Sequence, residues 1–589
     1  MPRGRGRGRG GHRGRGGRGG RGRGGARSAP ASGDGQAKED VQKDLDIETH
    51  PKEFFVGVVS TEDHQKAQEK NRPRYAAALA VLQKNGVAIA QNSRVRALAM
   101  ALARNDHELA DALLKNRDQF GLPEVLKALT LLDSGRQVRV LEKKLKRLQL
   151  SDSKVNPRKL GKLKSDIDNL TALKPPVGSA SGSVCKHIAH WAQGFTTEEL
   201  EFYALHLPKE PWKKLADICH FHPQKDFTAL PWFLPFCFGE AAPEGTMVAR
   251  CRDVTRENVN SLIEEYDIPY SHLKQLHDAL TEDSKKRIAE YEDKLDTVLW
   301  DYEDLACKAV DEVVERRLTQ GEAVNLPSGK LLERLLTFKM LRDNVDARSN
   351  RVQGSTDKAC FLPRLIRLAE PRLTSIQLPL EAPIVVIGDA SGSMGVAIRT
   401  STIIASLLTA ICSARLVFFN TENRDAPFLP ETVEQVLELA VTTQAAGGTA
   451  PAASLWPFYE RKEVVKTFIM VTDEEENSNC HGHRFAPLYK MYCDEVYPAR
   501  LVFVSFLRSQ HASGQMVNEL KGLGYNPLQF RLEGTRPDLS KLDNLFGLLS
   551  AASATFDEEL EETEKKIKTD GVAKVFDALK KELKAKAEN

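Results

Sequence analysis

The sequence predicts a multidomain protein in which a disordered tail and an α-helical solenoid precede a doubly wound α/β domain. Three observations predict this fold class. Residues 1–27 are almost entirely Gly and Arg, residues 61–370 repeat apolar side chains at helical spacing, and residues 384–389 and 467–473 are apolar runs that each end in an aspartate. A chain of 589 residues is too long for one core, so several domains are expected.

The composition sets limits on the cellular setting. The chain has 84 basic and 81 acidic residues, so it is nearly neutral overall, but the basic charge is concentrated in segments. Nine cysteines without a regular spacing are typical of reduced thiols. The first residues lack the apolar stretch of a secretory signal, and no run approaches the ~20 apolar residues of a membrane helix. We expect an intracellular protein, of the cytoplasm or the nucleus, that is neither secreted nor membrane-bound.

The Gly-Arg tail is expected to be disordered, because it cannot bury apolar surface. Residues 28–50 continue it as a linker. Arginine planes stack on bases and pair with phosphates, so we favour RNA contact over a merely solubilising or nuclear-targeting tail. Such tracts resemble the Arg-Gly-Gly (RGG) repeats of RNA-binding proteins. The candidate RNA-binding residues are Arg3, Arg5, Arg7, Arg9, Arg13, Arg15, Arg18, Arg21 and Arg23.

The helical region carries Ala-rich amphipathic runs, as at 75–82 and 95–103, and no strict repeat period. Short loops between such helices favour a solenoid of paired helices. Further helical runs are predicted over 125–132, 138–150, 197–205, 258–265, 273–299, 302–318 and 329–341.

One stretch of this region is basic and poor in acids, which fits either a solvated helix face or a phosphate-binding surface. Its basic residues are Arg136, Arg139, Lys143, Lys144, Lys146, Arg147, Lys154, Arg158, Lys159, Lys162 and Lys164. We take Lys143, Lys144, Lys146, Arg147, Arg158 and Lys159 as candidate RNA contacts.

Two clusters of Cys and His could suggest zinc. The first comprises Cys185, His187, His190, Cys219, His220 and His222. Its spacings match no standard zinc motif, so core or surface roles are favoured. The second, residues 480–483 with Cys493, is better explained as a surface loop.

Oxygen-bearing side chains gather at the ends of the two apolar strands. Asp389, Ser391 and Ser393 follow the first strand, Thr449 follows two glycines, and Asp473 ends the second strand. Open α/β sheets bind ligands at the carboxyl ends of their strands, so these groups are expected to meet there. A purely oxygen set without His or Cys suits Mg²⁺ or Mn²⁺. The acidic run 474–476 either holds the cation through water or makes the mouth of the site acidic.

These five positions resemble the metal-ion-dependent adhesion site (MIDAS) of the von Willebrand factor A domain. The resemblance implies that one divalent cation accepts an acidic group from a protein ligand. The alternative is a loop that keeps the motif and binds no metal.

The order of helical region and A domain resembles the Ro autoantigen family, which joins a TROVE ring of HEAT-like helices to an A domain. Residues 215–223 are similar to a Leu-…-Ser-His-x-x-Pro stretch of the TROVE module, with Cys219 in the place of the serine. The resemblance implies a helical module that can close into a ring, small or misfolded noncoding RNA as ligand, and His220 as an RNA contact.

The remaining segments complete the predicted organisation. The α/β domain is expected to hold helices over 394–411, 431–441, 453–461, 487–496 and 515–522 and strands over 414–419, 466–471, 500–506 and 528–532. A charged helix should pack its stripe of Val572, Phe576, Leu579 and Leu583 on the body. The predicted parts are the tail and linker 1–50, the helical module 61–370, the A domain 381–550 and the C-terminal helix 551–589.

We therefore expect a noncatalytic, monomeric RNA-binding protein of a ribonucleoprotein with a cation-dependent protein-docking site. The main alternative is a protein–protein scaffold in which the tail serves only localisation. A metal-dependent hydrolase that uses Asp389 and Asp473 ranks last, because the ligand set leaves no separate general base.

Overall fold

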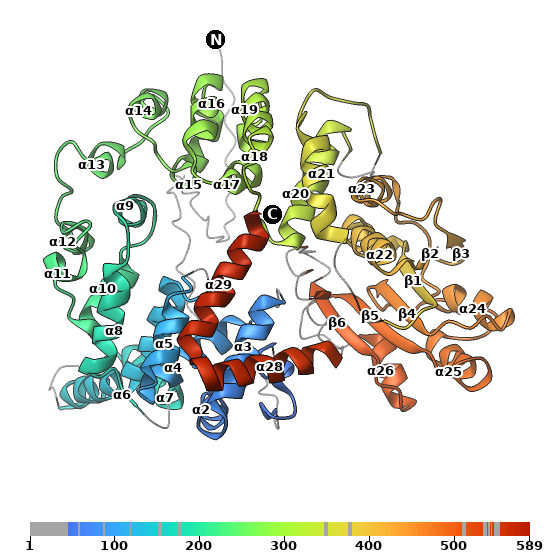
Figure 1. The fold of residues 1–589 in the computed structure, drawn as a ribbon, viewed down its shortest axis with the longest axis horizontal. Helices are drawn as coiled ribbons and strands as arrows, with labels where there is room; N and C mark the ends of the chain where they lie inside the picture. Colours follow the sequence, from blue (N-terminus) through green and yellow to red (C-terminus); the bar gives the residue numbers. More distant parts are fainter. Residues whose placement is uncertain are drawn as a thin grey trace, which may run out of the picture. The chain divides into compact units, whose positions relative to one another are not determined.

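The computed structural model describes residues 45–588 with short gaps (Figure 1). The gaps are 57–58, 86–88, 118, 151–155, 174–177, 347–350, 375–377, 379, 509–513, 534–538, 540–541, 543–544 and 547–553. The predicted Arg-Gly tail and its candidate arginines therefore lie outside the described residues, as does Lys154.

Helices make up the described part of the chain up to residue 374, apart from one isolated bridge between Val345 and Val352. The first half holds α1 (Pro51–Val56), α2 (Thr61–Lys70), α3 (Arg72–Lys84), α4 (Gln91–Ala103), α5 (His107–Leu114), α6 (Leu122–Gln149), α7 (Pro157–Leu173), α8 (Gly182–Gln193), α9 (Thr197–His206) and α10 (Glu210–Cys219). The second half holds α11 (Pro223–Asp226), α12 (Phe233–Cys237), α13 (Met247–Cys251), α14 (Val259–Glu265), α15 (Tyr270–Leu273), η1 (Lys274–Ala279), α16 (Glu282–Tyr291), α17 (Leu295–Trp300), α18 (Tyr302–Leu305), α19 (Lys308–Thr319), α20 (Ser328–Arg342) and α21 (Leu362–Thr374).

Local sequence explains where these helices begin. The hydroxyl of Ser60 accepts a hydrogen bond from the backbone N–H of Asp63 and caps α2. Thr196 and Glu199 form a reciprocal capping box at the start of α9. The Ala-rich stretch of α3 is buried along its length, because small side chains let neighbouring helices approach closely. The prediction of a mostly helical region is confirmed.

Some predicted helix bounds are wrong. The two runs expected over 125–132 and 138–150 belong to one continuous helix, α6. Conversely, the charged run 273–299 is divided among the end of α15, η1, α16 and α17. The hydroxyl of Thr281 caps α16, so the chain restarts a helix there instead of continuing one.

A six-stranded sheet follows the helical part, with strand order β3-β2-β1-β4-β5-β6. Its strands are β1 (Ile384–Asp389), β2 (Arg415–Phe419), β3 (Asn423–Asp425), β4 (Thr467–Thr472), β5 (Arg500–Leu507) and β6 (Leu528–Glu533). Its helical elements are η2 (Gly392–Gly395), α22 (Ile398–Cys412), α23 (Val433–Thr442), α24 (Ala452–Glu460), α25 (Phe485–Glu495) and α26 (Gln515–Gly522). The predicted doubly wound order holds for the parallel strands.

Alternate side chains of β1 point to opposite faces of the sheet, as the two-residue period of a strand requires. Val386 packs into the same cluster as α22 and α23, whereas Val385 joins the cluster of α24, α25 and α26. Helices therefore cover both faces, and β1 and β4 are fully buried. Their central position brings Asp389 and Asp473 to one edge.

The sheet differs from a purely parallel one at its edge. The short strand β3 pairs antiparallel with β2, and Arg424 faces Phe418 in this pairing. The sequence prediction missed β3, because Asn423, Arg424 and Asp425 carry no apolar signal.

The helical part and the sheet share one apolar cluster. Helices α20 and α21 pack on α23. The carboxylate of Glu370 on α21 accepts hydrogen bonds of 3.0 and 3.1 Å from the backbone N–H of Val433, the first residue of α23. A carboxylate is well placed at a helix N-terminus, where the backbone N–H groups are unpaired. Among the described helices, none is long and apolar enough to cross a membrane.

The C-terminal segment folds back on the first helices of the chain. It forms two helices, α28 (Ala554–Asp570) and α29 (Val572–Glu588), not the single predicted helix. Gly571, whose φ of 86° lies in the left-handed region that favours glycine, makes the break. Helix α28 packs on α3, and α29 packs on α3 and α5. Val572, Phe576 and Leu579 are buried as predicted, whereas the side chain of Leu583 lies outside the described set.

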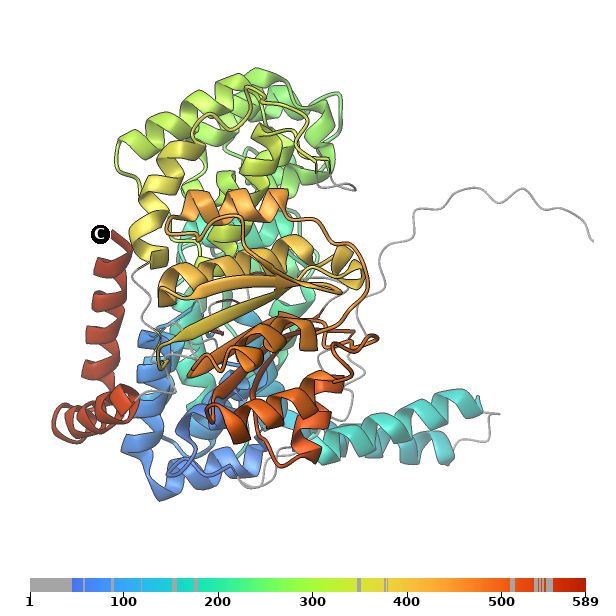
Figure 2. The same ribbon diagram turned by 90° about the vertical axis from the view of Figure 1, so that its right-hand side faces the viewer.

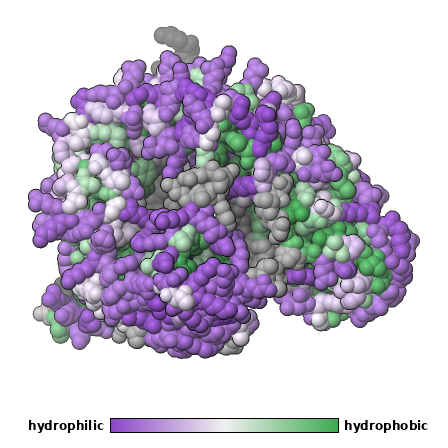
Figure 3. All heavy atoms as spheres, viewed as in Figure 1, coloured by the Kyte–Doolittle hydropathy of each residue, from purple (hydrophilic) through white to green (hydrophobic). Residues whose placement is uncertain are grey.

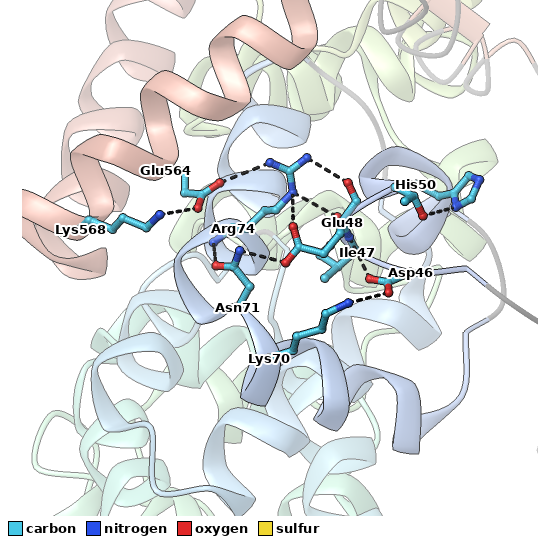
Figure 4. A network of polar contacts seen from close by, with 10 residues as sticks. Asp46, Ile47, Glu48, His50, Lys70, Asn71, Arg74, Glu564 and Lys568 are labelled. Atoms are coloured by element: carbon cyan, nitrogen blue, oxygen red, sulfur yellow. Dashed lines mark hydrogen bonds and ion pairs between the residues drawn. The ribbon is translucent and has the colours of Figure 1, made fainter.

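A polar network fixes this C-terminal segment (Figure 4). Nη1 of Arg74 on α3 lies 3.3 Å from Oε2 of Glu564 on α28. The same guanidinium donates to the backbone oxygens of Ile47 and Glu48. Lys568 lies 2.6 Å from the other oxygen of Glu564. The surface over α28 that faces the viewer is mainly hydrophilic, so its apolar side is the one turned to α3 (Figure 3).

Candidate metal centre and basic surface

The end of β1 forms the centre of the candidate metal site. Oδ1 of Asp389 accepts a hydrogen bond of 2.9 Å from the backbone N–H of Ser391. Its Oδ2 accepts one of 2.6 Å from Oγ1 of Thr472, at the end of β4. Asp389 and Ser391 are buried, and the hydroxyl oxygens of Ser391 and Ser393 lie 3.1 Å apart. The chain turns so that both hydroxyls lie beside one carboxylate.

Asp473 completes a pair of acids at this edge. The hydroxyl of Ser393 is a neighbour of its carboxylate and acts to lower its pKa. Burial and then the neighbouring charge of Asp473 raise the pKa of Asp389 to about 6. Burial also raises the pKa of Asp473. Among the described ion pairs, none joins Lys, Arg or His to either aspartate, so their negative charge is uncompensated within this part of the chain.

The Gly-Gly-Thr loop lies against the strand-end loop. Gly392 donates its backbone N–H to the carbonyl of Gly447 at 3.0 Å. Gly447 has φ of 84°, a conformation that favours glycine. Thr449 is buried, and its backbone N–H donates to Oδ1 of Asn477 at 3.0 Å. The three loops that carry the predicted ligands are therefore hydrogen-bonded to each other.

The residues present fit a divalent cation. Two carboxylates and two hydroxyls converge, with Thr449 in the adjoining loop, and all of them are oxygen donors. Mg²⁺ and Mn²⁺ favour such donors, and a cation would offset the repulsion between the two aspartates. That these residues bind a metal stays a prediction.

Three supporting residues of the site were not predicted from the sequence. Thr472 orients Asp389, Asn477 holds the loop of Thr449, and Asn420 donates from Nδ2 to the carbonyl of Ala446 at 3.0 Å. Thr472 has a sequence signal, since it directly precedes Asp473. The two asparagines have none, because loop contacts over such separations depend on the folded sheet.

The acidic run after Asp473 is mostly buried, a feature that neither interpretation of it included. Glu474 and Glu476 are buried, and Glu475 is the exposed member. Glu474 accepts hydrogen bonds from Ser505, Gln529 and the backbone N–H of Val517 in α26. Glu476 accepts one of 2.7 Å from the backbone N–H of Phe485, where α25 begins. Glu474 and Glu476 therefore accept backbone hydrogen bonds in the first turns of α26 and α25, and their carboxylates point away from the mouth of the site.

The basic residues of the helical region lie on α6 and α7, which pack side by side (Figure 2). Lys143, Lys144, Lys146 and Arg147 are exposed on the last turns of α6. Arg158 and Lys159 are exposed on the first turns of α7. All six are brought to the same end of this helix pair.

His220 lies apart from that end, after the last residue of α10. It is exposed, and its φ of 55° places it in the left-handed region. Helix α10 packs on α6, and Arg136 and Asp217 form an ion pair of 3.6 Å between them. His220 therefore lies near the middle of α6, where α10 packs on it. We call this region the base of the basic helix pair.

The zinc interpretation gains no support. Among the described residues, no group of three or more His, Cys, Asp or Glu could hold a metal ion. Nδ1 of His187 lies 2.7 Å from Oδ1 of Asp111, and its ring stacks on His107.

Comparison with solved structures finds loose similarity, with a TM-score below 0.5 for the match described here. No family model matches the chain, and no curated protein matches it. A crystal structure of the Ro protein (RSR) of Deinococcus radiodurans superposes with a TM-score of 0.37 and 14% identity. The match covers 83% of this chain and 95% of that protein. A superposition this loose identifies no family, so the resemblance to the Ro family rests on the sequence motifs.

Proposed function

We propose that this chain is a noncatalytic RNA-binding protein with a cation-dependent docking site for an acidic protein group. The helix pair α6–α7 and the Arg-Gly tail hold small structured RNA, and the strand-end loops of the sheet hold the cation. The observation that carries the RNA part is the uncompensated positive charge at the shared end of α6 and α7.

This charge is uncompensated by the protein itself. The exposed cations there are Arg139, Lys143, Lys144, Lys146, Arg147, Arg158, Lys159, Lys162 and Lys164. Among the described ion pairs, none includes any of them. Lys143 and Arg147 are four residues apart on α6, and Arg158 and Lys162 are four apart on α7, so like charges face each other. A polyanion would relieve this repulsion in both helices.

Surface cations elsewhere in the helical region are arranged differently. Lys274 lies 2.6 Å from Asp301, and Arg316 lies 3.2 Å from Glu290. Several exposed cations of the helical region therefore have acidic partners, whereas the described ion pairs include none for the cations at the shared end of α6 and α7. This contrast favours a phosphate-binding surface over a merely solvated one. We also propose that neighbouring pairs such as α6–α7 and α20–α21 are HEAT-like repeats.

The metal part of the proposal rests on the strand-end loops. Asp389, Ser391, Ser393, Thr449 and Asp473 would hold Mg²⁺ or Mn²⁺, and the bound cation would accept a carboxylate of the partner. Ser393 is exposed at the mouth, and Val396, three residues later, is 72% exposed. An apolar side chain this accessible beside the site supports a protein ligand over a small ion alone.

The test compares two full-length variants of equal net charge. The first replaces Lys143, Lys144, Lys146 and Arg147 by Gln. The control replaces four exposed lysines on other elements, namely Lys286, Lys490, Lys521 and Lys565. Binding of a transcribed hairpin RNA with a single-stranded end is measured by fluorescence anisotropy at several salt concentrations.

The α6 variant should lose at least about ten-fold in affinity, and its salt slope should fall by roughly three, since each phosphate contact contributes about 0.7–0.9 to the slope. The control should bind as the natural chain does. Equal loss in both variants would show that only net charge matters, and an unchanged α6 variant would favour the scaffold function. Replacing the tail arginines by Gln in the full chain measures the share of the tail separately.

A further inference from the structure

Two cysteines from different helices lie next to each other beside the basic helix pair. Cys185 is on α8, and Cys219 is the last residue of α10. Sγ of Cys185 donates to the carbonyl of Ile218 at 3.6 Å, and this carbonyl belongs to the peptide group that leads into Cys219. The thiol of Cys219 is the neighbouring group that most strongly shifts the pKa of Cys185. Helices α8 and α10 pack together, so this pairing is part of the fold.

The surroundings favour the thiolate form of Cys185. Hydrogen bonding with Cys219 lowers the pKa of Cys185 to about 7, and the charge of Arg136 adds to this effect, whereas burial and the negative charge of Asp133 oppose it. The shared hydrogen bond and then burial raise the pKa of Cys219. Burial raises the pKa of Cys237 to about 12 and that of Cys251 to about 11. Cys185 is therefore the expected nucleophile, and Cys219 is the thiol that can react with it afterwards.

The two cysteines are more exposed than Cys237 and Cys251. Cys185 and Cys219 are partly exposed, whereas Cys237 and Cys251 are buried. Redox-sensing cysteines combine partial exposure, thiolate character and a resolving cysteine nearby. The pair shows all three features.

We propose that Cys185 and Cys219 form an oxidisable pair that a hydroperoxide converts into a disulfide between α8 and α10. The thiolate of Cys185 attacks the peroxide oxygen, the O–O bond breaks, and hydroxide or alkoxide leaves with the electron pair. The resulting sulfenic acid is attacked by the sulfur of Cys219, whose proton passes to the departing hydroxide as water. Two thiols are oxidised to one disulfide, and one peroxide is reduced. A dithiol reductant reverses the reaction by thiol–disulfide exchange.

The link would act on a defined place in the helical part. Cys219 directly precedes His220, whose left-handed conformation ends α10. Asp217 on the last turn of α10 pairs with Arg136 of α6. A disulfide would therefore fix the end of α10 relative to α8, beside the base of the basic helix pair.

The test treats the reduced full-length protein with hydrogen peroxide at a low molar ratio. Free thiols are then blocked, and the digested protein is mapped by mass spectrometry without reduction. A linked peptide pair that contains residues 185 and 219 is expected, and it should vanish after dithiothreitol treatment. Cys360, which is exposed in the segment between α20 and α21, reports non-specific oxidation.

Two variants assign the steps. In Cys219→Ser, Cys185 should accumulate as a sulfenic acid that a cyclic 1,3-dione traps. In Cys185→Ser, Cys219 should remain a thiol. The proposal is overturned if the natural protein yields no linked pair while Cys360 is already oxidised. Trapping at Cys219 instead of Cys185 would also overturn it. Because the first measurement uses the natural chain, poor folding of a variant leaves the test intact.

Discussion

Thr472 donates a hydrogen bond of 2.6 Å to Oδ2 of Asp389 and so joins the ends of β4 and β1. The bond fixes the carboxylate of the first predicted ligand through a residue that is not itself a predicted ligand. Residues that orient metal ligands in this way commonly matter for affinity almost as much as the ligands.

The first prediction concerns this bond. In Thr472→Val the carboxylate of Asp389 loses its fixed orientation, so affinity for Mn²⁺ should fall about 10–100-fold. Thr472→Ser keeps the hydroxyl and serves as the matched control. Calorimetric titration of both variants with Mn²⁺ checks the outcome. Equal affinities in the two variants would contradict an orienting role.

A second prediction uses the repulsion between Asp389 and Asp473. In the presence of a chelator, Asp473→Asn should unfold at a higher temperature than the natural chain, because one of two facing negative charges is removed. Adding Mg²⁺ should stabilise only the natural chain, by about 2.7 kcal/mol when the free ion is 100-fold above its Kd. Thermal unfolding in chelator and in Mg²⁺ measures both effects. Equal Mg²⁺ stabilisation of the two chains would speak against the site.

The third prediction concerns Gly514, which precedes α26. A Cβ at this position would lie 1.9 Å from Oε2 of Glu474, and that buried carboxylate is fixed by three hydrogen bonds. Gly514→Ala should therefore lower the free energy of unfolding by about 1–3 kcal/mol. Gly522→Ala in the same helix is the control, since a Cβ there meets nothing within 4 Å. Denaturant titrations of both variants should separate them clearly.

The fourth prediction is a pH dependence from His64. This ring is buried, its Nδ1 lies 2.7 Å from Oη of Tyr75, and burial followed by the charge of Arg96 lowers its pKa from 6.5 to about 3. Below pH 6.5 the unfolded chain therefore binds a proton that the folded chain does not. Between pH 6.5 and 3, this histidine alone should remove about 1.4 kcal/mol of stability per pH unit.

Comparison with His64→Gln checks that expectation. The difference in unfolding free energy between the natural chain and the variant should change steadily as the pH falls from 6.5 towards 4. Above pH 7.5 the difference should be constant, because His64 is then neutral in both states. A constant difference over the whole range would contradict a lowered pKa.

The fifth prediction concerns the C-terminal helices. Arg74→Met removes the contact to Glu564, whose side chain is only 11% exposed. The loss should cost about 1.5–3 kcal/mol, as for a hydrogen bond to a charged group, and speed amide exchange throughout α28. Lys568→Met is the control, because this lysine is 56% exposed and its loss should matter little. Hydrogen exchange followed by mass spectrometry compares the two.

Sequence patterns predicted the parts of the sheet that are buried. The β-branched residues before Asp389 and the apolar run before Asp473 reveal β1 and β4, because strands covered on both faces must be continuously apolar. The same logic misses β3, whose Asn423, Arg424 and Asp425 face solvent or an edge. Hydropathy therefore identifies the centre of the sheet better than its rim.

The direction of single side chains was beyond these patterns. Glu474 looked like an exposed acid next to the site, but its φ of 61° turns the chain and sends the carboxylate inward. The partners that receive it, Ser505 and Gln529, are distant in sequence. Likewise, Gly571 is a residue that favours a helix break. The hydrophobic pattern does not reveal this break, because the apolar stripe begins at Val572, directly after it. Such features depend on contacts that only the folded chain creates.

The packing of α28 on α3 also has a consequence for biosynthesis. Arg74 and Glu564 are separated by 490 residues, so α3 leaves the ribosome long before its partner exists. At about 5–20 residues per second, the wait is roughly 25–100 s. During this time the side of α3 that α28 later covers is available to chaperones or to other nascent chains. Synthesis of the last few dozen residues therefore ends the period in which this side of α3 is uncovered.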